Sequence, residues 1–300
     1  MRKAAVDLVI TDLDNTLYDW FELWYHPFMT LLDALERDSG ISREVLVREI
    51  KQVHERHQTS EYAFLVQELP SLQKRHPGED VVKVYDDAIH EYRRIRKHHL
   101  QLYPGVLHTL EVLKRKGVLV VGYTESMSFY SASRVRALAL DGLLDFLYSP
   151  EDHALPDGLA RENIRMYSPE SYKLTRTVHR HTPAGELKPN PAILLDILRE
   201  VGGAVETSIY VGDSLIKDIL MAQEAGVTDV HAKYGTAHTR EEYELLRSVT
   251  HWTAEQVERE RTAGFRTVRP TFTLERSFEE LLDLFELRPF RESSLARALP

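Results

Sequence analysis

VDLVITDLDNTLYDW, residues 6–20, joins a short apolar run to a pair of acids. The run Val6 to Ile10 predicts a strand buried on both faces. It leads directly into Asp12 and Asp14, which stand two residues apart. Ligands of open parallel sheets bind outside the carboxyl ends of the strands, so we expect chemistry here. Acids beside a buried strand are costly unless they are neutralised, and two acids with a hydroxyl suit a hard cation and a phosphoryl group.

The same residues have a plainer interpretation. Asp, Asn and Thr favour turns, because their side chains bond to nearby backbone groups. The string DLDNT is therefore a moderate signal by itself, and its meaning depends on the motifs that follow it.

Composition narrows the class of protein. The chain has 300 residues, 43% of them hydrophobic, so it can bury a full core in one or two domains. Its net charge of −9 argues against nucleic-acid or anionic-membrane partners. The absence of cysteine excludes disulfides, thiolate zinc sites and cysteine nucleophiles. The first apolar run is too short for a signal peptide, and none is long enough for a membrane span, so we expect a soluble, cytoplasmic protein.

Residues 18–102 contain helical patterns and no convincing strand. Leu23, Phe28 and Leu31 recur at helical spacing, and 80–98 resembles one full helix. This pattern predicts an all-helical insertion that forms a small bundle.

From Tyr103 onward the chain alternates helices with short buried strands, which predicts an α/β fold with a parallel sheet. The expected strands are 118–123, 146–148, 207–211, 227–232 and 271–274, and helices are expected near 106–116, 128–140, 191–198 and 278–287. We therefore predict a core domain of residues 1–17 and 103–290 and a helical domain of residues 18–102. Two insertions, a loop near 150–187 and a charged helical excursion near 238–265, interrupt the core, and 291–300 is expected to be a disordered tail.

Polar residues follow four of these elements. Asp12 and Asp14 end the first strand, Thr124 ends the strand 118–123, Lys188 precedes a helix in KPNP, and Asp213 ends a strand in GDSLIKD. In this order and context the chain resembles the haloacid-dehalogenase superfamily of phosphotransferases. The resemblance implies a Rossmann-like core whose helical insertion is a cap in the family's first position.

The resemblance also implies a mechanism. Asp12 would attack phosphorus and form an aspartyl-phosphate, while Asp14 would act as general acid and then general base. Mg²⁺ would bind Asp12, the backbone carbonyl of Asp14, and Asp213. The remaining predicted site residues fall into two groups: Thr124, Glu125 and Lys188 on the phosphate, and Asp218, Ser214 and Thr16 in support.

Some positions depart from the family pattern, and alternatives stay open. Glu125 stands where Asn or Asp is common, Asn190 stands where Asp is common, and the stretch before Lys188 is longer than usual. The acid at Asp14 disfavours halide and phosphonate chemistry. A phosphatase acting on a small phosphorylated metabolite is our main hypothesis. A phosphomutase, or a catalytically idle binding or regulatory protein, is the alternative. The sequence gives neither the substrate nor the oligomeric state. We expect residues 18–102 to gate the site, because both linkers of this segment lie beside it.

Overall fold

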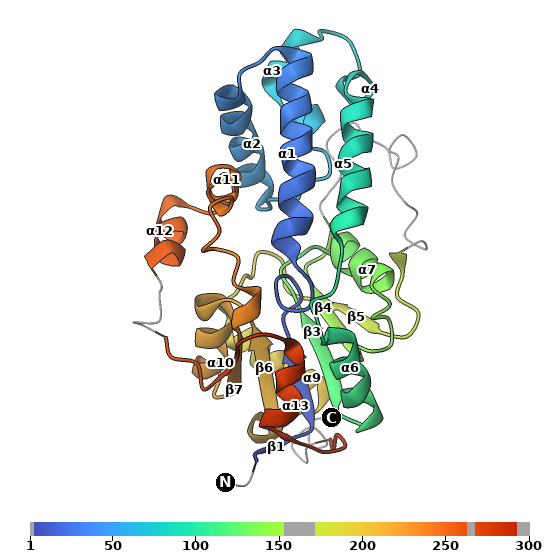
Figure 1. The fold of residues 1–300 in the computed structure, drawn as a ribbon, viewed down its shortest axis with the longest axis vertical. Coiled ribbons are helices and arrows are strands. Elements are labelled where there is room, and N and C mark those ends of the chain that lie inside the picture. Colours follow the sequence, from blue (N-terminus) through green and yellow to red (C-terminus); the bar gives the residue numbers. More distant parts are fainter. Residues whose placement is uncertain (1–2, 153–171, 263–267, 293–300) are drawn as a thin grey trace.

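The computed structural model describes residues 3–152, 172–262 and 268–292. These residues form a helical unit, here residues 18–102, and an α/β core that lies at one end of it (Figure 1). Residues 153–171 of the predicted loop and residues 293–300 of the predicted tail lie outside the described residues. No described helix has both the length and the apolar character that a membrane crossing requires.

The core is built on a parallel sheet of seven strands in the order β5-β4-β3-β2-β6-β7-β8. β2 lies at its centre, between β3 and β6, as the fully buried first run predicts. The strands are β2 Leu8–Thr11, β3 Leu119–Tyr123, β4 Phe146–Ser149, β5 Val178–His181, β6 Ser208–Gly212, β7 Thr228–Ala232 and β8 Phe272–Leu274. The predicted α/β fold with a parallel sheet is confirmed.

Two strands were not predicted. β5 is an edge strand of sequence VHRH whose side chains are exposed or half-buried, so it carries no apolar pattern. β9 (Glu286–Leu287) pairs in parallel with β1 (Ala5–Val6) in a separate small sheet. The helix predicted for 278–287 is therefore wrong at its end. A 3-10 turn and α13 (Leu281–Leu284) stop where the chain extends to pair with β1.

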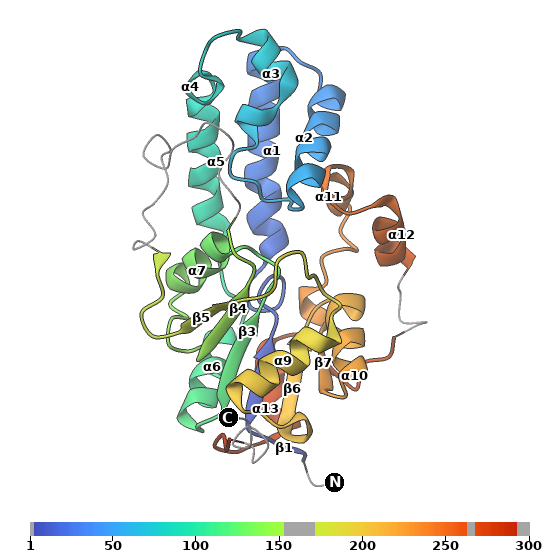
Figure 2. The same ribbon diagram turned by 180° about the vertical axis from the view of Figure 1, so that it is seen from behind.

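Helices cover both faces of the sheet, as the two opposite views show (Figures 1 and 2). α6 (Val106–Arg115), α7 (Ser128–Ala137) and α13 pack with one face, which includes Val9. α9 (Pro191–Val201) and α10 (Met221–Glu224) pack with the other face, which includes Leu8 and Ile10. Successive residues of β2 therefore enter two different apolar layers, which explains why the whole strand is apolar.

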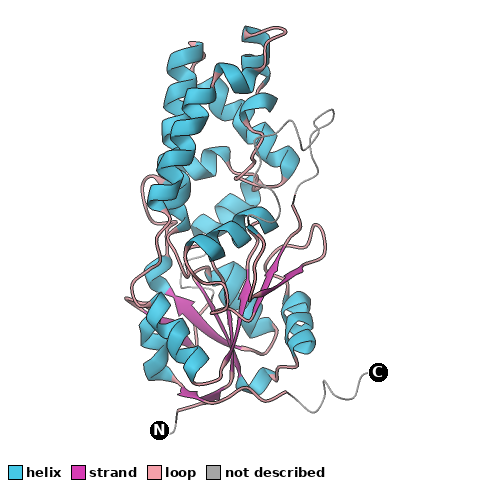
Figure 3. Ribbon diagram, turned by 90° about the vertical axis from the view of Figure 1, so that its right-hand side faces the viewer, coloured by secondary structure: helices cyan, strands magenta, loops and turns pink. Residues whose placement is uncertain are grey.

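The helical unit stands above the carboxyl edge of the sheet (Figure 3). It leaves and rejoins the core at adjacent points, because the Tyr103 N–H donates to the Leu17 carbonyl at 3.0 Å. Its α-helices are α1 Trp20–Ser39, α2 Arg43–His57, α3 Pro70–Arg75, α4 Val81–Val84 and α5 Asp86–His99. The helix predicted for 80–98 is thus broken at Tyr85, whose side chain is buried in the apolar cluster of the helical unit.

The charged excursion after β7 packs on the helical unit. It is helical, as predicted, and forms α11 (Tyr243–Val249) and α12 (Ala254–Thr262). Leu246 and Val249 are fully buried in the same apolar cluster as residues of α1 and α2. His54 Nδ1 lies 2.7 Å from the Val249 carbonyl oxygen, which joins α2 to the end of α11. This segment, which we predicted as part of the core, is a third connection between the core and the helical unit.

The buried His54 gives a testable pH dependence. Burial lowers the pKa of His54 from 6.5 to about 4. An unfolded chain therefore binds more protons than the folded chain between these values, and stability falls as pH drops from 6.5 towards 4. At pH values below about 4, this pKa shift lowers the free energy of unfolding by roughly 3 kcal/mol.

We expect His54→Gln, which keeps a donor for Val249, to lose stability less steeply over this window. Urea unfolding at pH 7.0, 6.0 and 5.0 measures the effect. The half-buried His179 and His251 also have a lowered pKa and remain in the variant, so the slope should decrease without vanishing. If the free energy of unfolding falls with pH equally steeply in wild type and His54→Gln, His54 does not cause the pH dependence.

Candidate active site

The predicted site residues meet at the carboxyl edge of the sheet, below the helical unit. β2, β3 and β6 are neighbours in the sheet, so their ends bring Asp12, Thr124 and Asp213 to one place. Lys188 comes from the loop before α9 and reaches the same place.

Lys188 lies between two acids and is almost fully buried. Its Nζ donates to Asp12 Oδ1 at 2.6 Å and to Asp218 Oδ1 at 3.0 Å. Asp218 also accepts the Tyr210 hydroxyl at 2.9 Å and the Ser214 N–H at 3.0 Å. Both Asp218 oxygens are therefore engaged, and Asp218 holds Lys188 and the loop after β6 in place.

Burial and repulsion between neighbouring acids disfavour the charged forms of Asp12 and Asp213. Burial raises the pKa of Asp12 to about 8, opposed by Lys188 and reinforced by Asp218 and Asp14. Burial, with Asp218 and Asp12, also raises the pKa of Asp213 well above its usual range. Lys188 thus balances only part of the negative charge of Asp12, Asp213 and Asp218. A bound cation would lower the pKa of both Asp12 and Asp213.

This donor set fits magnesium. Carboxylate oxygens of Asp12, Asp213 and Asp218 lie within 4.8 Å of one another. Mg²⁺ takes oxygen ligands, often one or two carboxylates with water completing its shell. Because Asp218 is already used by three donors, Asp12 and Asp213 are the two that fit best as direct ligands.

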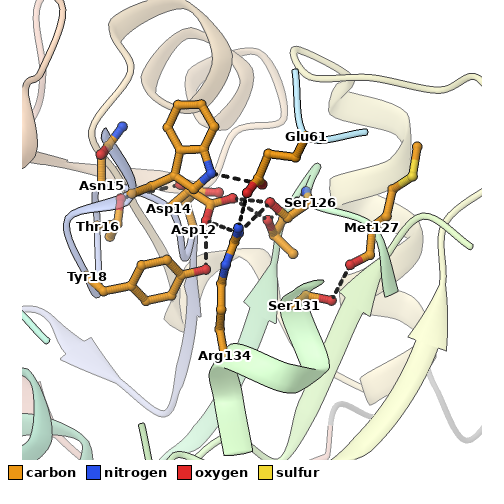
Figure 4. Close-up of polar contacts among 12 residues, drawn as sticks. Asp12, Asp14, Asn15, Thr16, Tyr18, Glu61, Ser126, Met127, Ser131 and Arg134 are labelled. Atoms are coloured by element: carbon orange, nitrogen blue, oxygen red, sulfur yellow. Dashed lines mark hydrogen bonds and ion pairs between the residues drawn. The ribbon is translucent and has the colours of Figure 1, made fainter. Parts of the chain in front are cut away.

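Asp14 belongs to a different polar group, which includes Tyr18, Ser126 and Arg134 (Figure 4). Its Oδ1 accepts from the Tyr18 hydroxyl at 2.6 Å and from Arg134 Nη1 at 3.1 Å. Its Oδ2 accepts from the hydroxyls of Ser126 at 2.6 Å and Thr124 at 3.2 Å. Asp12 is held by an ammonium group and Asp14 by hydroxyls and a guanidinium, so the two acids have distinct environments.

Arg134 connects Asp14 to the helical unit. Its second guanidinium nitrogen forms an ion pair with Glu61, which follows α2 (Figure 4). Glu61 also accepts from Arg96 of α5 at 3.1 Å and from Trp20 Nε1 of α1 at 3.0 Å. Burial opposes ionisation of Glu61, but Arg134 and Arg96 hold its pKa below the usual range. The helical unit therefore reaches the candidate site through a buried, charged carboxylate.

Glu125 links two loops. Its carboxylate accepts the Lys188 N–H at 2.9 Å and Lys217 Nζ at 2.6 Å. The Trp252 ring lies 5.0 Å from Lys217 Nζ. We predicted that Glu125 contacts phosphate. Its carboxylate is occupied and would repel phosphate, so only its backbone N–H could make that contact.

The loop after β2 is held by close packing. Asn15 has a left-handed φ of 57° and accepts the Phe21 N–H at 3.0 Å. Gly235 lies against this turn, and a Cβ there would be 1.6 Å from the Asn15 carbonyl oxygen. Thr16 Oγ1 is 3.5 Å from Asp12 Oδ2, a contact at the limit of a hydrogen bond. Backbone contacts, more than Thr16, therefore fix the loop that carries both acids.

Sequence reasoning missed four residues of this site: Tyr18, Glu61, Ser126 and Arg134. Ser126 had a usable signal, since it lies two residues after Thr124 at the same strand end. Glu61 and Arg134 had none, because their pairing depends on how the helical unit docks on α7.

The chain is similar in sequence to known hydrolases and phosphatases. Residues 6–226 match the family described as hydrolase, haloacid dehalogenase-like hydrolase. The chain is 24% identical over 240 residues to a glyceraldehyde 3-phosphate phosphatase of Methanopyrus kandleri, covering 77% of this chain and 85% of the relative. It is 24% identical over 159 residues to a phosphoglycolate phosphatase of Agrobacterium fabrum, covering 53% of this chain and about half, 54%, of that relative.

Solved structures share the fold. A HAD phosphatase from Thermococcus onnurineus has a TM-score of 0.52 at 17% identity, covering 93% of this chain and 97% of its own. A 2-haloacid dehalogenase from Pseudomonas syringae has a TM-score of 0.51 at 19% identity, with the same coverage. Different named activities occur on this fold, so the fold alone does not choose between them.

The Glu61 network predicts a stability effect. Glu61→Gln removes the charge that compensates two arginines, one of them fully buried. Breaking such a pair costs about 3 kcal/mol or more, because the remaining cation stays desolvated. Urea unfolding at pH 7 measures the loss. Glu91→Gln is the control, since Glu91 forms an exposed pair with Arg94 and should leave stability unchanged. Equal stability of the two variants would show that Glu61 carries no buried charge.

Proposed function

Because the chain belongs to the haloacid dehalogenase-like hydrolases, we propose that it is a magnesium-dependent phosphatase that acts on a small phosphorylated metabolite. The observation that carries the proposal is the separation of two neighbouring acids into different environments. Asp12 is bonded to Lys188 beside other acids, while Asp14 is bonded to hydroxyls and Arg134. Two acids in different environments suit two roles, nucleophile and acid–base catalyst.

Asp12 is the proposed nucleophile. Its carboxylate attacks phosphorus, the bond to the leaving oxygen breaks, and an aspartyl-phosphate forms. Lys188 holds one carboxylate oxygen and balances the charge of the phosphoryl group. The bound Mg²⁺, held by Asp12 and Asp213, would supply further charge neutralisation. Thr124 and the backbone N–H groups after β3 would hold phosphoryl oxygens.

Asp14 is the proposed acid–base catalyst. It donates a proton to the leaving oxygen, then removes one from the water that hydrolyses the aspartyl-phosphate. Tyr18, Ser126 and Arg134 fix the orientation of its carboxylate. A dehalogenase needs no proton at this step, so the positioned acid favours phosphate over halide chemistry.

The helical unit is the proposed cap. Glu61 and Arg134 lie beside Asp14, so the leaving group would meet polar and charged side chains. The relatives are named for phosphorylated two- and three-carbon compounds, which supports a small polar substrate. Movement of this cap would have to break the Glu61–Arg134 pair and carry α11 with it. A phosphomutase would use the same acids, and transfer to a second substrate hydroxyl instead of water would reveal it.

The central test removes the nucleophile. Asp12→Asn should lower magnesium-dependent hydrolysis of p-nitrophenyl phosphate by several orders of magnitude, because the covalent route is lost. Asp196→Asn, at an exposed position on α9, is the matched control and should keep full activity. Retained helical circular dichroism excludes misfolding as the cause. Hydrolysis by Asp12→Asn at the normal rate would overturn the assignment.

A second test addresses the acid. Asp14→Asn should slow hydrolysis of alkyl phosphates more than of p-nitrophenyl phosphate, since the nitrophenolate leaves without a proton. The ratio of kcat/KM for the two substrates measures this, with wild type as reference. An equal loss on both substrates would assign Asp14 a purely structural role.

A further inference from the structure

A second cluster of metal-ligating side chains lies at the base of the helical unit. Glu22 and His26 are one helical turn apart on α1, and His99 is the last residue of α5. Ligand atoms of the three residues lie within 4.8 Å of one another. The cluster shares no residue with the acids around Lys188.

Contacts hold the three side chains in place. His26 Nε2 lies 2.7 Å from Glu22 Oε2, and the rings of His26 and His99 stack with centroids 4.3 Å apart. Arg240 donates to Glu22 Oε1 at 2.9 Å, which leaves Oε2 directed to the cluster. Side chains from two helices therefore lie side by side, and Arg240 of the segment after β7 holds Glu22. For both imidazoles to bind one ion, the stacked rings would turn so that a nitrogen of each faces it.

The cluster is also accessible. All three residues are half-buried, and a pocket of about 320 Å³ includes Glu22, His99 and Asp19 in its lining. An ion bound there would have protein ligands on one side and the pocket on the other. Water or another small ligand could complete its coordination from the pocket.

We propose that Glu22, His26 and His99 bind a divalent transition-metal ion, with zinc the best-suited one. Two imidazole nitrogens and one carboxylate oxygen, with an open fourth position, form a ligand set that zinc takes in proteins. Magnesium prefers oxygen ligands and octahedral geometry, so it does not compete well here. The proposal does not depend on the phosphatase activity.

The position suggests what the ion does. α1 begins just after the chain leaves the core, and α5 ends just before it returns. An ion shared by the two helices ties both linkers of the helical unit together. Because it binds the folded arrangement, it stabilises the folded chain by mass action.

The experiment starts from full-length protein stripped of bound metal. Excess Mg²⁺ is then added, so that it competes with zinc for the acids around Asp12. Isothermal titration with Zn²⁺ should give one high-affinity site per chain. His26→Ala and His99→Ala should each weaken that site at least about tenfold, since each removes a ligand. His90→Ala, on the exposed part of α5, is the control and should keep the affinity of wild type.

Two further measurements distinguish the loss of a zinc ligand from a failure to fold. Each variant should match the melting temperature of wild type without zinc, and only wild type and His90→Ala should show a rise with zinc. Should an alanine variant fail to fold, Co²⁺ added to wild type should give visible absorption bands of a four-coordinate site. No zinc binding, no such cobalt spectrum, or zinc binding unchanged in both ligand variants would overturn the proposal.

Discussion

The buried ammonium group of Lys188 holds the candidate site together. Its side chain is 2% exposed, as is that of Asp218, so both charges lie in a medium of low polarity. Such charges are tolerated only when they are paired and hydrogen-bonded. Asp12 follows β2, Lys188 lies in the loop before α9, and Asp218 lies in the helical turn Leu215–Leu220 after β6. Their mutual need for charge compensation holds these three segments together. The same shortage of positive charge makes the site receptive to a cation.

The electrostatics divide the site into two halves. On the side of β6, the acids Asp12, Asp213, Asp218 and Glu125 outnumber the two lysines, Lys188 and Lys217. On the side of α7, Arg134 and Arg96 balance Asp14 and Glu61. In the proposed reaction, the phosphoryl group would lie beside Lys188, and the second half would set the environment of the leaving group. Because Glu61 belongs to the helical unit, the proposed movement of that unit would change the surroundings of Asp14.

Much of this could be predicted from local patterns. The strand before Asp12, the glycine before Asp213 and the prolines after Lys188 each mark the end of an element, and parallel topology brings these ends together. Three features carried no such mark. β5 is an edge strand with polar side chains, Glu61 meets Arg134 only through docking, and α11 has an apolar face that fits either part of the chain. Each depends on contacts between residues far apart in sequence, which periodicity does not record.

The packing of α11 on α2 has a consequence for synthesis of the chain. Residues 18–102 leave the ribosome early, yet their apolar cluster includes Tyr243, Leu246 and Val249. By the time those residues emerge, β2 through β7 have all been made. The helical unit is translated early, but the last helix that packs on it is made only after most of the sheet. Until then the part of the cluster that α11 covers stays exposed, and apolar surface exposed in this way favours aggregation of a nascent chain.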